Sequence, residues 1–162
     1  CRRQRQMCIR DSIADVHSRA TRSRNMAAIR GKDTKPELLI RKALHARGFR
    51  YRLHDKRLPG RPDLVFPKYK AVIQIHGCFW HGHGCHLFKW PATRKEFWED
   101  KIGNTVVRDS GTKEELEQLG WRVLTIWECA VKGKGRLNHN RLLKRVCDWL
   151  EKSRRSMEIA GK

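Results

Sequence analysis

The chain has 162 residues, of which 39% are hydrophobic and six are tryptophan, a composition that favours one domain with a packed core over a disordered chain. Thirty-seven lysines and arginines against 17 aspartates and glutamates give a formal charge of +20, which suits a polyanionic partner, above all nucleic acid. No stretch approaches the roughly 20 apolar residues of a membrane span and no secretory signal is visible, so we expect a soluble, cytoplasmic protein.

The N-terminal segment does not resemble the rest of the chain. Residues 1–13 carry four arginines and one aspartate without hydrophobic periodicity, and we interpret them as a non-native or disordered extension. No repeat, low-complexity tract or Pro/Gly-rich linker divides the remainder. We therefore expect a single domain over residues 14–153, followed by a C-terminal tail over residues 154–162.

The expected elements are those of a mixed α/β domain. A short helix is predicted over Arg22–Ile29, capped by Thr21 or Ser23. A second helix begins at Thr34, where a capping hydroxyl, Pro36 and Glu37 form a capping box, and it ends before Gly48. Further along, alternation and apolar runs predict strands at Phe49–Leu53, Asp63–Phe66, Ala71–Ile75 and Trp121–Trp127, a helix from Arg94 to Leu119 interrupted near Gly103 and Gly111, and a last helix over Arg141–Ser153.

Chemistry is expected where the two central strands meet. Asp63 begins one strand and His76 follows the next, and their short connection makes them an antiparallel hairpin. Phosphodiester hydrolysis needs a carboxylate that holds a hard cation such as Mg²⁺ and a group that transfers protons. Asp63 is the candidate carboxylate and His81 or His76 the proton carrier. Glu37 is a candidate second carboxylate, although the capping box alone would account for it, as a turn would for Asp63.

The run from His76 to Cys85 is dense in cysteine, histidine and aromatic residues. Isolated cysteines around a histidine favour a metal site over disulfides. Three thiols and one imidazole make a tetrahedral, structural zinc set, and the candidates are Cys78, His83, Cys85 and, from the end of a later strand, Cys129. His86 could replace His83, and unpaired cysteines with solvated histidines are the alternative. Cys147 is interpreted as a core residue.

Four separated motifs resemble the very-short-patch repair (Vsr) DNA mismatch endonuclease family. They are Leu58–Asp63, His76–His81, Pro91–Arg94 with Glu96–Trp98, and Gly120–Leu124 with Trp127–Cys129. The resemblance runs from about Ala14 to Leu150. It implies a restriction-endonuclease-like α/β fold, with a central mixed β-sheet flanked by helices and a structural zinc site. It also implies a nick on the 5′ side of the thymine in a T:G mismatch, which arises when 5-methylcytosine deaminates.

The resemblance also implies roles for individual residues. The catalytic set would be Asp63, His81, His76, Glu37 and Asp109. Asp63 would bind Mg²⁺ together with the main-chain carbonyl of Ile75, where the family often has threonine. His81 would be the general acid/base, and Asp109 would orient His76. The zinc ligands would be Cys78, His83, Cys85 and Cys129, with Gly82 and Gly84 standing where the family can have histidine.

Aromatic residues acquire a function from the same resemblance. Phe79, Trp80 and Trp98 correspond to rings that wedge into the duplex beside the mismatch, where unstacking costs least. We interpret three other rings as core: Trp121, Trp127 and Trp149.

The partner that the resemblance implies is double-stranded DNA with a T:G mismatch, and mismatch-repair proteins of the MutL type are implied in the same way. A monomer is expected because the lesion is asymmetric, and the expected location is the bacterial cytoplasm, in association with the nucleoid. Two alternatives remain: a related nuclease with another DNA target, and a zinc-dependent DNA-binding module without catalysis.

Overall fold

The computed structural model describes residues 18–28 and 32–162, and the chain divides into two compact units, residues 1–31 and 32–162. In the first unit, helix α1 covers Arg19–Ala28 and so begins three residues earlier than predicted. Ser18 Oγ accepts a hydrogen bond from the backbone N–H of Thr21 at 3.2 Å, so the capping residue is Ser18. The extension expected over residues 1–13 lies outside the described residues.

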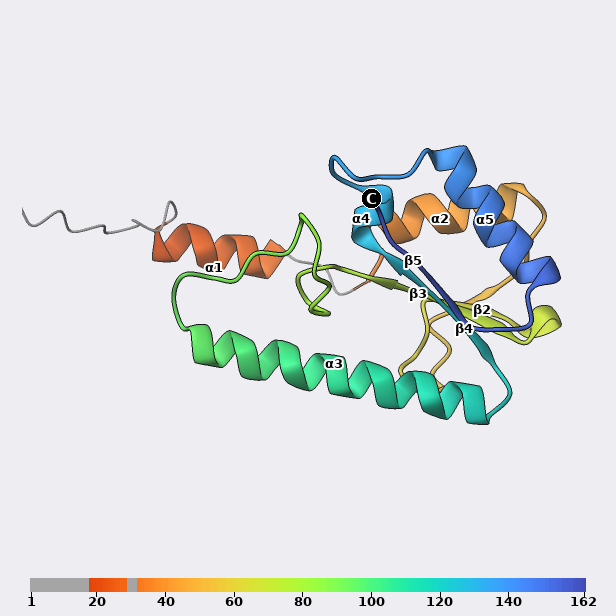
Figure 1. The fold of residues 1–162 in the computed structure, drawn as a ribbon, viewed down its shortest axis with the longest axis horizontal. Helices are drawn as coiled ribbons and strands as arrows, with labels where there is room; N and C mark the ends of the chain where they lie inside the picture. The colour runs from red at the N-terminus through yellow and green to blue at the C-terminus, as the bar shows by residue number, and fades with distance from the viewer. Residues whose placement is uncertain (1–17, 29–31) are drawn as a thin grey trace, which may run out of the picture. The chain divides into compact units, whose positions relative to one another are not determined.

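The second unit is built on a five-stranded mixed sheet with the order β1-β2-β3-β4-β5 (Figure 1). The predicted hairpin is confirmed, because β2 pairs antiparallel with β3. Strand β2 also pairs antiparallel with β1, and β4 runs parallel to both β3 and β5. The strands are β1 (Arg52–Leu53), β2 (Leu64–Phe66), β3 (Ala71–His76), β4 (Arg122–Trp127) and β5 (Met157–Ile159).

Helices cover both faces of this sheet (Figure 1). Alternate residues of each strand point to opposite faces, so the sheet carries two hydrophobic clusters. The larger cluster packs against α2 (Lys35–Ala46) and α5 (His139–Lys152) and includes Ile40, Leu44, Phe66, Ile73, Leu124, Ile126, Leu143 and Val146. The smaller one packs against α3 (Lys95–Gln118) and consists of Val65, Val72, Leu116 and Val123.

The capping box that predicted the start of α2 is confirmed. Thr34 Oγ1 donates a hydrogen bond to Glu37 Oε1 at 2.8 Å and accepts one from the Glu37 N–H at 3.5 Å. Glu37 Oε2 also accepts the N–H of Asp33 at 3.0 Å, and only 6% of Glu37 is exposed. The carboxylate of Glu37 is therefore held in place beside the sheet.

Two predicted elements differ from the structure. The strand expected over Phe49–Leu53 is reduced to its last two residues, because Phe49 and Tyr51 instead turn into the core, where their rings lie 6.4 and 5.6 Å from that of Phe66. The interruptions expected near Gly103 and Gly111 are absent, since α3 runs unbroken through both. Neither glycine has a neighbour that its missing side chain would meet, so both are tolerated on open sides of the helix.

The C-terminal region holds elements that the sequence did not predict. Residues 154–162 were expected to form a tail, but Met157–Ile159 pair with β4 as β5, and Ile159 is fully buried. A short helix, α4 (Glu128–Val131), follows β4 directly. Among the described residues, no helix is long and apolar enough to cross a membrane.

Candidate active site and metal centre

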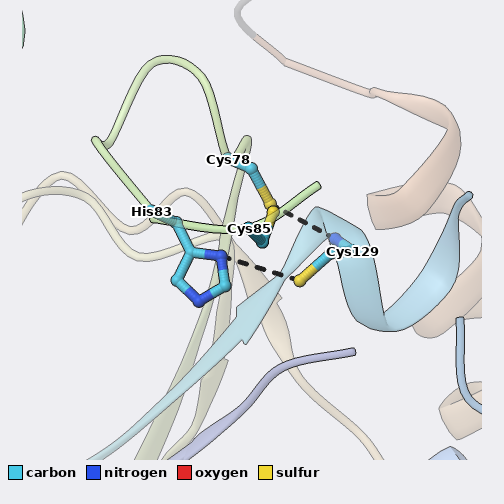
Figure 2. Close-up of side chains that lie close together, drawn as sticks. All are labelled: Cys78, His83, Cys85 and Cys129. Atoms are coloured by element: carbon cyan, nitrogen blue, oxygen red, sulfur yellow. Dashed lines mark hydrogen bonds between the residues drawn. The ribbon is translucent and has the colours of Figure 1, made fainter. Parts of the chain in front are cut away.

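The four side chains expected to bind zinc converge on one point (Figure 2). One ligand atom from each of Cys78, His83, Cys85 and Cys129 lies within 4.8 Å of the others. Three of these residues belong to the loop after β3, and Cys129 belongs to α4. Because β3 and β4 are parallel neighbours, with His76 opposite Trp127, both segments leave the sheet at the same edge. The sheet register thus brings together residues some 50 positions apart in the chain.

The surroundings of the sulfur atoms fit a metal centre. Each of the three sulfurs accepts a backbone N–H: Cys78 Sγ from Cys129 at 3.3 Å, Cys85 Sγ from Leu87 at 3.4 Å, and Cys129 Sγ from Gly161 at 3.2 Å. Such bonds stabilise thiolates. Burial raises the pKa of the thiols of Cys78 and Cys129, so a bound cation is needed to deprotonate them at neutral pH. Three thiolates and an imidazole are the donor set that Zn²⁺ prefers.

The geometry favours His83 over His86 as the fourth member of this cluster. His83 Nδ1 lies 3.6 Å from Cys129 Sγ (Figure 2). His86 lies outside the cluster, and its ring packs against the turn at Gly133 and Gly135. Burial also makes His83 less basic, because it lowers the pKa of this imidazole, and a neutral imidazole is the form that binds metal.

His81 and Asp109 form the shortest polar contact near the end of β3. The Nδ1 atom of His81 lies 2.5 Å from Asp109 Oδ2, and the ring of His76 stacks on that of His81 with centroids 3.8 Å apart and planes 5° apart. We expected Asp109 to orient His76, but it bonds to His81, because the unbroken α3 carries Asp109 alongside the loop after β3. Asp109 makes no hydrogen bond to His76, but one ligand atom from each of His76, His81 and Asp109 lies within 4.8 Å of the others, and the charge of Asp109 opposes the lowering of the His76 pKa.

Electrostatics separates the two histidines. Burial and the charge of His81 lower the pKa of His76 to about 4, so His76 is neutral at physiological pH. Burial would raise the pKa of Asp109, but the hydrogen bond and charge of His81 outweigh it and hold that pKa below its ordinary value. Of the two candidate proton carriers, His81 is the one with an ionised carboxylate partner.

Asp63 directly precedes β2. Its Oδ2 atom accepts the backbone N–H of Ile75 at 2.7 Å, and its side chain is 23% exposed. Burial raises the pKa of Asp63 to about 6; the Ile75 N–H opposes this effect and the charge of Glu37 adds to it. The N–H and C=O of one strand residue point to the same side, so the Ile75 carbonyl also faces Asp63. A carboxylate and a carbonyl are donors that suit a hard cation such as Mg²⁺.

His54 is a neighbour of Asp63 that the sequence analysis missed. Its Nδ1 atom lies 3.7 Å from Asp63 Oδ1, and its ligand atom lies within 4.8 Å of those of Asp33 and Glu37. The hairpin register carries the signal that could have found it, because Leu53 pairs with Leu64 and thereby sets His54 beside Asp63. Asp33 is bound to Arg41 and Glu37 is bound in the helix cap, whereas the Nε2 atom of His54 is buried without a hydrogen-bond partner among the described residues.

The three residues expected to wedge into DNA form one aromatic cluster. The ring of Phe79 lies 5.1 Å from Trp80 and 5.3 Å from Trp98, and the two indoles are 6.0 Å apart. All three side chains are partly exposed, and Lys101 Nζ lies 5.5 Å from both indole rings. The cluster therefore offers flat apolar surface beside a positive charge, which suits contact with DNA.

The three tryptophans interpreted as core residues lie in different environments. Trp149 is buried and Trp121 packs against the smaller core cluster, as predicted. Trp127 is partly exposed and packs instead between two histidines, His83 and His76, at ring distances of 4.3 and 5.5 Å. Its position was not foreseen, because an apolar strand end looks the same whether it meets a core or a site.

These features define the class of the protein. The site holds a partly buried carboxylate of raised pKa with a histidine–carboxylate pair near it, and the chain is strongly basic. This combination is typical of a nuclease, which hydrolyses phosphodiester bonds of nucleic acid.

Comparison with known proteins then specifies the family. The profile of the DNA mismatch endonuclease Vsr family matches residues 14–87. DNA mismatch endonuclease Vsr of Escherichia coli (strain K12) is 50% identical over 138 residues, which are 85% of this chain and 88% of that protein. The type II nicking enzyme V.NmeAIP of Neisseria meningitidis is 44% identical over 84% of this chain and 99% of its own length, and V.XorIIP of Xanthomonas oryzae is 45% identical over 69% and 82%. The chain belongs to the Vsr family of DNA endonucleases, which have a restriction-endonuclease-like fold.

Proposed function

We propose that this endonuclease nicks double-stranded DNA on the 5′ side of the thymine in a T:G mismatch, the product of 5-methylcytosine deamination, and so initiates very-short-patch repair. The observation that carries the proposal is the continuity of Phe79, Trp80 and His81. Two rings of the aromatic cluster and the histidine of the His81–Asp109 pair are consecutive residues of one loop. A duplex that accepts the rings therefore has its backbone next to the pair.

The aromatic cluster supports a preference for mismatched DNA. Unstacking a base step costs a few kcal/mol and costs least at a mismatch. A ring that replaces the lost stacking returns part of that cost. Phe79, Trp80 and Trp98 are partly exposed and in mutual contact, so together they present aromatic surface that suits stacking on bases.

Proton transfer is assigned to His81. His81 Nδ1 donates a hydrogen bond to the carboxylate of Asp109, which leaves Nε2 of the same ring to exchange a proton at the scissile phosphate. His76, neutral and stacked on His81, holds the plane of that ring. Mg²⁺, held by the carboxylate of Asp63 and the carbonyl of Ile75, would polarise the phosphate and lower the pKa of the attacking water. Glu37 adds negative charge beside Asp63, which favours a cation there.

The cluster of Cys78, His83, Cys85 and Cys129 is proposed to bind structural Zn²⁺. All four positions of a tetrahedral ion would be filled by protein, which leaves no open position for hydrolysis. The ion would hold the loop that carries Phe79 and Trp80 of the aromatic cluster as well as His81. Action as a monomer, and cooperation with mismatch-repair proteins of the MutL type, remain predictions from the family resemblance.

A different DNA target is the second candidate, because two relatives at 44% and 45% identity are named type II nicking enzymes. One experiment separates the candidates. The zinc-loaded protein is incubated with Mg²⁺ and otherwise identical duplexes that carry T:G, C:G or T:A at one position, at low and moderate salt, because phosphate contacts weaken as salt rises. We expect nicks in the T:G duplex alone.

Asp63→Asn should abolish the nicks, whereas Asp100→Asn, an exposed carboxylate of α3, should leave them unchanged. Nicks in fully paired DNA at the same rate would favour the second candidate. Binding without any nick in any duplex would contradict both and indicate a DNA-binding module.

A further inference from the structure

Trp127, the last residue of β4, lies between the two functional clusters. Its indole stacks on the ring of His83, with centroids 4.3 Å apart and planes 15° apart. On its other side it meets the ring of His76 nearly edge-on, at 5.5 Å and 74°. One side chain therefore contacts both a member of the Cys/His cluster and a member of the active-site histidine pair.

The contacts continue without a gap to the catalytic pair. His76 stacks on His81 at 3.8 Å, and His81 bonds to Asp109 at 2.5 Å. The order of contacting groups is thus His83, Trp127, His76, His81 and Asp109. These groups come from the loop after β3, from β3 and β4, and from α3.

The orientation of the indole is fixed from β5. Trp127 Nε1 donates a hydrogen bond to Glu158 Oε2 at 3.2 Å, and Glu158 also pairs with Lys113 of α3 at 3.4 Å. Trp127 is partly exposed and belongs to neither hydrophobic core cluster. Burial of apolar area is therefore not its main contribution, and its defined plane points to another role.

His81 needs such support because it lies in an irregular loop. A group that transfers protons must keep its orientation within about 10–20° to act efficiently, and the backbone of His81 is held by a single turn hydrogen bond, to the Gly77 carbonyl at 3.2 Å. A stack of rings anchored in β3 and β4 provides that orientation.

We propose that Trp127 is a positioning residue that couples the Cys78–His83–Cys85–Cys129 cluster to the His81–Asp109 pair through His76. The inference rests on the proposed function for the roles of zinc and of His81. It predicts that the metal cluster holds the catalytic pair in place through the stacked side chains as well as through the backbone of the loop.

Nicking kinetics provide the first test. Trp127→Leu removes the stack, and Trp127→Phe keeps a ring but loses the hydrogen bond to Glu158. Trp121→Leu is the matched control, since Trp121 directly precedes the same strand but packs against the smaller core cluster. In zinc-loaded, folded protein, Trp127→Leu should lower kcat about tenfold or more, as loss of supporting contacts around a site commonly does, with KM and zinc content unchanged. Trp127→Phe should recover most of kcat, and Trp121→Leu should keep it.

A double-mutant comparison shows whether Trp127 acts through His76. In a His76→Ala background, Trp127→Leu should cost less than about twofold in kcat, because the contact that it removes is already lost. If Trp127→Leu does not fold, Trp127→Met takes its place with the same expected results. A kcat for the Trp127 variant equal to that of Trp121→Leu, or full additivity with His76→Ala, would overturn the proposal.

NMR of the imidazole resonances tests positioning without reference to activity. In Trp127→Leu, the ring protons of His76 should shift because they lose the ring current and the contact of the indole, and those of His81 should shift because the ring of His76 that stacks on them is no longer held. In Trp121→Leu, neither set should shift. If the parent protein nicks no duplex but these shifts occur, the proposed function fails and the positioning role stands. If the resonances of His76 and His81 match those of the parent, the positioning role fails whatever the nicking assays show.

Discussion

The Nδ1 atom of His81 lies 2.5 Å from the carboxylate of Asp109, which is 28 residues further along the chain. This contact joins an irregular loop to the long helix α3. It also selects the tautomer of the imidazole, because a carboxylate at Nδ1 requires the proton there and leaves Nε2 free. The pair thus combines positioning with preparation of the proton-transfer atom.

Asp109→Asn is expected to lower kcat for nicking by about tenfold to a hundredfold, because the amide no longer stabilises a protonated imidazole and can turn its NH₂ group toward His81. Affinity for the T:G duplex should stay within about twofold, since Asp109 carries no proposed DNA contact. Single-turnover rates and a binding titration measure the two quantities, with Asp100→Asn as the control. An unchanged kcat would show that Asp109 does not support His81.

Cys129→Ser is expected to weaken zinc retention by at least about tenfold, because it removes one of four ligands from a closed site. The free energy of unfolding should fall with it, since metal binding contributes directly to folding. Cys147→Ser is the matched control, because Cys147 is a free cysteine of α5 outside the cluster. Chelator competition with metal analysis measures retention. Equal zinc retention in both variants would exclude Cys129 as a ligand.

Trp80→Ala is expected to reduce discrimination between T:G and C:G duplexes by about 1–3 kcal/mol, the usual contribution of one base–aromatic stack. The loss should appear mainly as weaker binding of the T:G duplex, because paired DNA gains little from the ring. Trp90→Ala is the control, since Trp90 is also exposed but contacts Phe88 rather than the three wedge rings. Equal losses for both duplexes would assign Trp80 to general DNA binding.

Asp63→Asn is expected to stabilise the zinc-loaded, Mg²⁺-free protein at pH 8. Because the pKa of Asp63 is raised from 3.8 to about 6, the folded protein binds this proton more tightly than the unfolded chain, and ionisation costs up to about 3 kcal/mol. The cost is fully present above pH 6 and fades as the pH falls toward 4. Urea unfolding should therefore show a larger advantage for the variant at pH 8 than at pH 5.

Added Mg²⁺ gives the complementary result. It should stabilise the parent protein at pH 8 more than Asp63→Asn, because the ion binds only where the carboxylate is present. An advantage of the variant that is the same at pH 5 and pH 8, together with equal responses to Mg²⁺, would contradict a strained, metal-binding carboxylate at this position.

Local signals accounted for much of the fold. Thr34 and Glu37 marked the start of α2 because a capping box is a contact between residues three positions apart. The β2–β3 hairpin followed from two apolar runs and a short link. Strand β5 could not be predicted in this way, because three residues show no periodicity and Met157–Ile159 become a strand only through pairing with β4.

The site divides along the same line. The zinc set of Cys78, His83, Cys85 and Cys129 was readable from the residue types and their places in the sequence, and family resemblance supplied Asp109 as a member of the site. The partner of Asp109 was not readable, because it depends on α3 remaining straight through Gly103 and Gly111. His54 and Trp127 were missed for a similar reason, since their neighbours are set by strand register.

Mapping the break in a duplex with a single T:G pair, labelled differently on its two strands, is the measurement that tests the central claim most directly. With Mg²⁺ and zinc-loaded protein, we predict a break in the thymine strand alone, at the phosphate on the 5′ side of the mismatched thymine, and no break with Asp63→Asn. Breaks in both strands, a break elsewhere, or an equal rate when the pair is changed to C:G would contradict it.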